Sequence, residues 1–466
     1  MSVGNKLFYS IIMLSSLGAP GLEALTPEQA ELQARQLYMR LTSVPPSPEL
    51  LRLMKESVMK GRTDLAAFKA MENILFYSVT IRNMVSAWTN REQSPFVPLN
   101  DATALMVGLV YENYAFNEAL YGDVLYSAHP AADYRGPVDL PNARTIPPLL
   151  TQVGQQLTYQ WLATDTRITF GSPPDGTTRE DHFTSLDRAT QEWPRLLHRG
   201  KQSDVYRQAT GTTGGSALAS TQTNIDSSNI AGILTTSTFA RAGYQAGTNR
   251  RGIDMLMKNF LGRDMRAMHD TSLPDTWVGP DVDPAPGGDF RVYQNECRGC
   301  HAIMDGFRGA FAYFDFNQGG LTYNPENIPT RNEVSCADDP GPGVHKFFRG
   351  CNLAPYRRRT EDDSWTNMAR TGVNRSLGWR DGPSSGRGAR SFGLAIARAQ
   401  AFSQTMAKHV FKQVCVRDPN EAETNSLSKV ASSFETGFEN YDTLSASGPY
   451  NMRALFAIVS TMCFGR

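Results

Sequence analysis

The chain has 466 residues with 46 basic and 46 acidic side chains, so its formal net charge is zero. A 40% apolar share with 10% aromatic residues is enough for a hydrophobic core, which excludes global disorder. The balanced charge argues against nucleic acid or an anionic membrane surface as the partner, because both attract a basic excess. The length predicts two to three domains, or one large domain with elaborations.

Residues 1–24 are predicted to form a secretory signal peptide. Lys6 precedes the apolar run Leu7–Leu17, and small, helix-breaking residues follow, with cleavage expected near Ala24. The alternative is a buried N-terminal helix. The run is shorter than the roughly 20 apolar residues that a membrane helix needs, and no later run reaches that length. The sequence therefore predicts an exported chain, periplasmic or extracellular, without a transmembrane segment, in a compartment that permits disulfides.

Successive capping signals predict that residues 25–208 form a helical N-terminal region. Thr26-Pro27-Glu28-Gln29 has the form of a capping box, in which the Thr and Gln side chains bond each other's backbone N–H groups. Ser47-Pro48 begins a second predicted helix that runs to Gly61, Thr63-Asp64 caps a third, and 102–125 is a further helical stretch. Such repeated signals favour a helical array over a sheet.

Residues 209–230 are rich in Gly, Ser and Thr and are predicted to form a loop or linker. The region that follows, 231–466, returns to helical signals. The predicted helices start at Arg250, cover Ser391–Cys415 as one element, start again after Asp418-Pro419-Asn420, and start at Pro449 to end at Cys463. The predicted fold class is mainly α, with long irregular loops.

Cys297-Arg298-Gly299-Cys300-His301 has the C-x-x-C-H spacing of a c-type haem attachment site. Two thiols three positions apart can add to the two vinyl groups on one porphyrin edge, and the adjacent His301 then serves as the proximal iron ligand. A redox C-x-x-C site usually starts a helix in a βαβ setting, and a zinc site needs a second ligand pair at matched spacing. Neither setting is evident, so the motif predicts one covalent haem c.

The other cysteines are Cys336, Cys351, Cys415 and Cys463. The first two flank a loop, and the last two stand at the ends of predicted helices whose ends meet if the helices run parallel. The economical pairing is therefore Cys336–Cys351 and Cys415–Cys463, and the alternative is buried thiols.

A distal haem ligand would be His or Met. His269 lies on the segment that leads into the motif, and Met368 is the main methionine candidate. An open, five-coordinate iron is the alternative.

Four arginines are candidates for pairing with haem propionates, because a guanidinium offers a two-pronged donor. A solvated surface position is the alternative for each. These residues are Arg250, Arg251, Arg298 and Arg308.

The sequence resembles the planctomycete-type cytochrome c proteins, a group of large exported proteins. The segments that are similar include Arg40–Glu49, Gly232–Thr236 with Thr248–Gly252, Cys297–Asp305 with Phe314-Asp315, and Arg453–Cys463. A long insertion over 320–365 departs from the pattern. The resemblance implies a mainly helical cytochrome with one covalent haem, with a helical cytochrome c-like region at 231–466, and it implies no substrate.

The sequence favours electron transfer, with a redox protein or a larger assembly as the partner, over turnover of a substrate. No small-molecule substrate is identifiable, yet 466 residues are far more than one haem requires. Two alternatives stay open: a haem enzyme, as a peroxidase or a dehydrogenase subunit, and a structural or assembly protein in which haem mainly stabilises the fold.

Overall fold

The computed structural model is mainly α-helical, as the sequence predicts, with a few short strands. The predicted signal peptide, most of the 209–230 segment, and Cys336 and Cys351 lie outside the residues that it describes. The described residues are 25–128, 191–203, 225, 227–244, 249–317, 320–323, 360–438 and 448–464.

The first three helices begin where local signals place them. They are α1 (Pro27–Thr42), α2 (Pro48–Met59) and α3 (Thr63–Met71). The capping box is confirmed, with Gln29 N donating to Thr26 Oγ1 at 3.2 Å and Thr26 N donating to Gln29 Oε1 at 2.8 Å. The predicted cap at Thr63-Asp64 is wrong, because the capping position is Arg62, which instead forms an ion pair with Asp64.

The helical stretch predicted over 102–125 is interrupted. Asn100 caps α5 (Asp101–Tyr111), and the chain then turns at Asn113, whose φ of 66° is left-handed. A short α6 (Glu118–Tyr121) follows, and the chain enters β1 (Leu125–Ala128), which pairs antiparallel with β2 (Leu197–Gly200). The π-helix η1 (Phe76–Ile81) and α4 (Arg82–Ser86) precede this segment.

The central part of the chain surrounds the C-x-x-C-H motif. Helix α12 (Arg250–Leu261) begins where predicted and ends at Gly262, whose left-handed φ of 69° suits glycine. The other elements are η6 (Ser227–Asn229), η7 (Gly232–Thr235), α11 (Ser237–Gly243), η8 (Pro286–Gly288), α13 (Phe290–Val292), η9 (Tyr293–Cys297), α14 (Arg298–Arg308), η10 (Gly309–Phe311), β3 (Phe314–Asn317), β4 (Gly320–Tyr323), β5 (Ser364–Thr366), η13 (Met368–Arg370), η14 (Gly372–Leu377) and β6 (Ser385–Arg387). Strands β3 and β4 pair antiparallel, as do β5 and β6.

The single helix predicted over Ser391–Cys415 is wrong, because two helices meet at Ala399. This residue has an extended ψ of 138°, and Gln400 N donates to the carbonyl of Gly378 at 2.9 Å. A tertiary hydrogen bond thus replaces a helical one. The C-terminal helices are α15 (Gly388–Arg398), α16 (Gln400–Cys415), α17 (Glu421–Thr436) and α18 (Met452–Phe464), the last starting three residues after Pro449.

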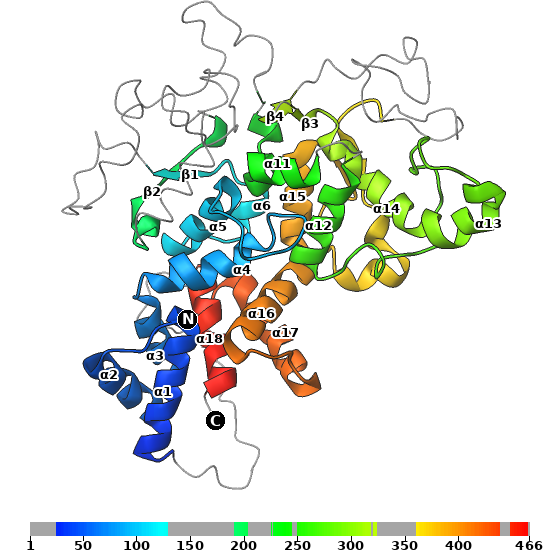
Figure 1. The fold of residues 1–466 in the computed structure, drawn as a ribbon. Helices are drawn as coiled ribbons and strands as arrows, with labels where there is room; N and C mark the ends of the chain where they lie inside the picture. Colours follow the sequence, from blue (N-terminus) through cyan, green and yellow to red (C-terminus); the bar gives the residue numbers. More distant parts are fainter. Residues whose placement is uncertain are drawn as a thin grey trace, which may run out of the picture.

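The two ends of the chain build one hydrophobic core. Figure 1 shows the blue helices α1–α3 beside the orange α16 and the red α18, and α18 packs against α3 and α1. Phe76 of η1 and Phe456 of α18 meet edge to face with ring centroids 5.0 Å apart. The predicted boundary at 209–230 therefore does not separate two cores, since residues from both sides of it share a single buried cluster.

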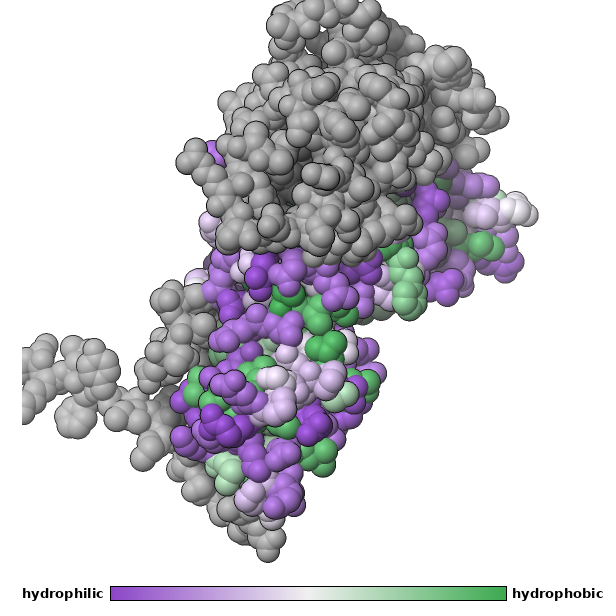
Figure 2. Space-filling view, turned by 60° about the vertical axis from the view of Figure 1, so that its left-hand side comes forward, coloured by the Kyte–Doolittle hydropathy of each residue, from purple (hydrophilic) through white to green (hydrophobic). Residues whose placement is uncertain are grey.

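The described residues on the face drawn in Figure 2 are mostly hydrophilic. Figure 2 shows one face on which apolar residues form separate small spots among polar ones. Phe96 and Phe290 are the most exposed large apolar side chains of the described residues, at 90% and 65%. No helix in the described part of the chain is long and apolar enough to cross a membrane.

Candidate functional site

Glycines fix the position of the motif helix α14. A Cβ atom on Gly309 would lie 1.9 Å from the carbonyl oxygen of Ser364, and one on Gly306 would lie 2.7 Å from that of Thr366. Only a residue without a side chain lets strand β5 approach this closely. The far half of α14 is therefore buried and held in place, while its first turn bears the C-x-x-C-H motif.

The motif residues share one partly exposed face. On a helix of 3.6 residues per turn, Cys297, Cys300, His301 and Met304 fall within a sector of about 100°. All four are partly exposed, whereas Ala302, Ile303 and residues 305–308 are buried. We call these four residues the motif face. It presents sulfur atoms and an imidazole at the surface of a helix that is otherwise packed into the protein.

The two motif cysteines are thiols and do not form a disulfide. Cys300 Sγ lies 3.1 Å from the carbonyl oxygen of Met265. Burial raises the pKa of both thiols, and nearby acidic side chains add to this effect. A dithiol redox site instead lowers the pKa of its attacking cysteine. The direction of these pKa shifts therefore does not match a disulfide-exchange site.

The imidazole of His301 is backed by a buried carboxylate. Its Nδ1 atom lies 3.5 Å from Oδ2 of Asp305, whose side chain is fully buried one helical turn further along. Burial alone would raise the pKa of Asp305, but the charges of Arg250 and Arg308 outweigh it and hold this pKa well below its usual value. An ionised carboxylate beside Nδ1 favours the proton on that nitrogen, which leaves the lone pair of Nε2 available to bind a metal.

Asp305 belongs to a buried cluster of two arginines and two aspartates. Arg250 donates from Nε to Asp305 at 2.5 Å and from Nη1 to Asp281 at 2.6 Å. Arg308 donates to Asp281 at 3.2 Å, and the backbone N–H of Gly279 donates to Asp305 at 2.7 Å. Each charge is thus paired, as buried charges need to be.

This cluster corrects two of the predicted propionate contacts. Arg250 and Arg308 direct their guanidinium groups at Asp281 and Asp305, and the side chain of Arg308 is 1% exposed. They stabilise the region behind His301 and are not placed to reach a ligand on the motif face.

The other two predicted arginines have different surroundings. Arg298 lies within the motif, is partly exposed and donates from Nη2 to the carbonyl of Thr271, while its buried Nε has no hydrogen-bond partner among the described residues. Arg251 is exposed on α12. Arg298 is thus the better placed of the four to meet a group on the motif face.

Both predicted distal ligands lie against other sides of α14. A Cβ atom on Gly299 would lie 2.8 Å from the His269 ring, and one on Gly306 would lie 3.1 Å from Cγ of Met368. Gly299 and Gly306 are about 160° and 140° around the helix from His301. Neither side chain therefore lies over the motif face, from beyond which a distal ligand would have to approach.

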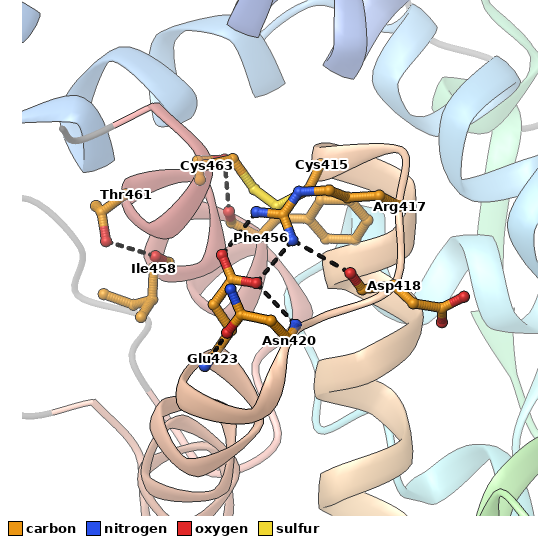
Figure 3. The surroundings of a disulfide bond; sticks show 10 residues. Cys415, Arg417, Asp418, Asn420, Glu423, Phe456, Ile458, Thr461 and Cys463 are labelled. Atoms are coloured by element: carbon orange, nitrogen blue, oxygen red, sulfur yellow. Dashed lines mark hydrogen bonds and ion pairs between the residues drawn. A yellow bond between two sulfur atoms is a disulfide. The ribbon is translucent and has the colours of Figure 1, made fainter.

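The predicted disulfide between Cys415 and Cys463 is confirmed, with the two Cα atoms 5.4 Å apart. It joins the C-terminal ends of α16 and α18 (Figure 3). Beside it, Arg417 makes two hydrogen bonds to Glu423, at 2.7 and 2.6 Å, at the start of α17. The predicted Cys336–Cys351 pair lies outside the described residues.

The comparisons with known proteins found nothing: no protein-family model, no curated protein and no solved structure matches this chain. Function therefore has to be argued from the site itself. Within the described residues, no cluster of three or more His, Cys, Asp or Glu side chains could hold a metal ion on its own.

The residues of the motif face fit a covalently bound haem. Covalent attachment of haem requires two thiols that are not oxidised, and proximal ligation requires an imidazole that is free to bind iron. The motif face offers both thiols, an imidazole whose Nδ1 faces a carboxylate, and a partly exposed helical surface. Asp305 and Asp281 are not among the functional residues that the sequence predicts. His301 and Asp305 are four residues apart in a helix, and this spacing is the sequence signal that indicates Asp305.

Proposed function

We propose that this protein is an exported c-type cytochrome with one covalent haem that transfers electrons, alone or within a larger assembly. The observation that supports it most is the motif face, where two thiols and an imidazole backed by Asp305 lie together. The proposal does not depend on the resemblance to a cytochrome family, although it agrees with it.

Each residue has a definite role in this proposal. Cys297 and Cys300 would attach the porphyrin edge, His301 would ligate iron through Nε2, and Asp305 would hold the imidazole in the required tautomer. The haem supplies one-electron redox chemistry when bound. Arg298 would meet a propionate, because it flanks the motif and offers a guanidinium.

A haem enzyme is the second candidate, favoured by one specific observation. Neither His269 nor Met368 lies on the side from which a sixth ligand would come. An iron with an open position reacts with small molecules, as a peroxidase requires.

The visible absorption spectrum of the purified holoprotein separates the two. Electron transfer predicts a low-spin spectrum that cyanide, carbon monoxide and hydrogen peroxide leave unchanged, together with rapid reversible oxidation and reduction. A high-spin spectrum that shifts with peroxide would contradict the electron-transfer proposal and support the enzyme.

A further inference from the structure

A polar groove that is lined by none of the motif-face residues lies along one side of α16. Its volume is about 520 Å³, within the usual range for small-molecule sites. Gln404, Lys408 and Lys412 recur along α16 at helical spacing and line its floor. The C-terminal end of α12, the segment η14 and the start of α17 form its walls, and Figure 1 shows α12, α16 and α17 close together.

The groove has a marked excess of positive charge. Four cationic side chains line it, and Asp418 is the one carboxylate among the lining residues; the cations are Lys258, Arg263, Lys408 and Lys412. The chain as a whole has zero net charge. Lys408 and Lys412 are four residues apart on α16, a spacing at which like charges repel each other and destabilise the helix.

Helix dipoles do not account for this excess. Helices α12 and α16 both end at the groove, and each C-terminal end carries about half a negative charge. The N-terminal end of α17 also lines the groove and carries about half a positive charge, which cancels one of these ends. After Asp418 is counted as well, at least two of the four positive charges are left without compensation in the groove.

Neutral groups hold two of these cations in place. Lys258 donates to Oε1 of Gln93, and Arg263 donates to the carbonyl of Val373 at 3.0 Å and to Oγ of Ser376 at 2.8 Å. Of the four cations, only Lys412 has a carboxylate partner among the described residues, Asp418 at 2.8 Å. Two of the four charges, those of Lys258 and Arg263, are therefore oriented by neutral groups without being neutralised.

We propose that this groove binds a small oxyanion with at least two negative charges, of the phosphate or polycarboxylate class. Two uncompensated positive charges call for a multivalent anion, and Thr405, Gln404 and Ser376 supply hydrogen-bonding groups in the same lining. This site is independent of the haem proposal, because none of its residues belongs to the motif face.

Isothermal titration of the mature chain at low ionic strength tests the groove. The probes are pyrophosphate for the phosphate class and citrate for the polycarboxylate class, and acetate serves as the monovalent control. We expect one or both multivalent probes to bind at a single site and acetate not to bind measurably. If neither multivalent probe binds, the proposal is wrong.

Two variants locate the binding. Lys258→Gln with Lys408→Gln should weaken it at least tenfold, and Lys429→Gln, an exposed change on α17 outside the groove, should alter it less than twofold. Equal losses in both variants would show general charge attraction and overturn the proposal. Thermal melting of each variant verifies that the fold is kept.

Discussion

Asp305 is the residue behind the motif face that acts most directly on the imidazole of His301. It faces Nδ1 of His301 at 3.5 Å and accepts hydrogen bonds from Arg250 and the Gly279 N–H. If haem binds as proposed, a carboxylate in this position would make the imidazole a stronger donor to the iron and so favour its ferric state. Arg250 and Arg308 moderate that effect, because their charges balance those of the two aspartates.

We predict that Asp305→Asn raises the reduction potential of the holoprotein. The neutral amide removes the negative charge beside His301, and the loss of this charge favours the reduced state of the iron. Asp281→Asn is the matched control, since it removes a buried negative charge from the same cluster without facing the imidazole. Spectroelectrochemical titration should show the larger rise for Asp305→Asn, and equal shifts would contradict the positioning role.

His409 should make stability depend on pH. Burial lowers its pKa, although the hydrogen bond between Nε2 and the Asn259 carbonyl, at 2.9 Å, opposes this. The unfolded chain then binds a proton at higher pH than the folded one, so stability is lost as pH falls below the ordinary value of about 6.5. Urea unfolding at pH 7.5 and 5.5 should show this loss.

The His409→Gln variant is the control for that effect. Gln keeps a hydrogen-bond donor but does not titrate, so its free energy of unfolding should change less between the two pH values. A variant with the same pH dependence as the wild type would show that other groups cause it.

At the scale of elements, local signals predicted the starts of helices but not their interruptions. Helices α1, α2 and α17 are each capped by a side chain that accepts a hydrogen bond from the first turn of its own helix, and the capping residues are Thr26, Ser47 and Asn420. Donor and acceptor in each of these bonds are only a few residues apart in the sequence. The break at Ala399 depends on Gly378, which is distant in sequence, and Ala and Gln are good helix formers. Likewise, only packing shows that glycines hold His269 and Met368 against other sides of α14.

Replacement by alanine should destabilise the protein more at Gly262 than at Gly61, the other helix-ending glycine compared with it. Its φ is 69°, and an added Cβ atom would lie 2.8 Å from Oγ1 of Thr405. Gly61 has the same φ of 69° at the end of α2, with nothing within 4 Å of such an atom. Gly61→Ala should cost about 1–2 kcal/mol from backbone strain alone, and Gly262→Ala should cost more.

Urea denaturation of the two glycine variants measures these costs. The difference between them isolates the contact with Thr405, because the backbone strain is common to both. Equal losses would contradict the close packing of α12 against α16.

At the scale of the whole molecule, the N-terminal and C-terminal helices share one core. Helices α1 and α3 pack against α18, and α1 also packs against α16, so the motif region and the N-terminal region are expected to unfold together. The Gly-, Ser- and Thr-rich segment 209–230 has the composition of a linker, and this composition predicts a boundary between the two regions. Composition alone does not reveal that the chain returns to pack on its beginning.

The Cys415–Cys463 disulfide should stabilise this shared core. It closes a loop with a sequence separation of 48, which is worth about 4 kcal/mol on the chain-entropy model. Cys415→Ser should lower the melting temperature and leave haem attachment unchanged. Thermal melting with and without reductant checks this, and a wild-type melting temperature in the variant would contradict it.

The most direct test of the central claim is the intact mass of the chain, exported by a host that attaches haem to C-x-x-C-H motifs. We predict that the denatured wild-type protein keeps the mass of one haem and stains for haem on a denaturing gel. Cys297→Ala with Cys300→Ala should lose both signals, whereas Cys415→Ser should keep them. A wild-type chain without added mass, or a double variant that still holds haem covalently, would contradict the account.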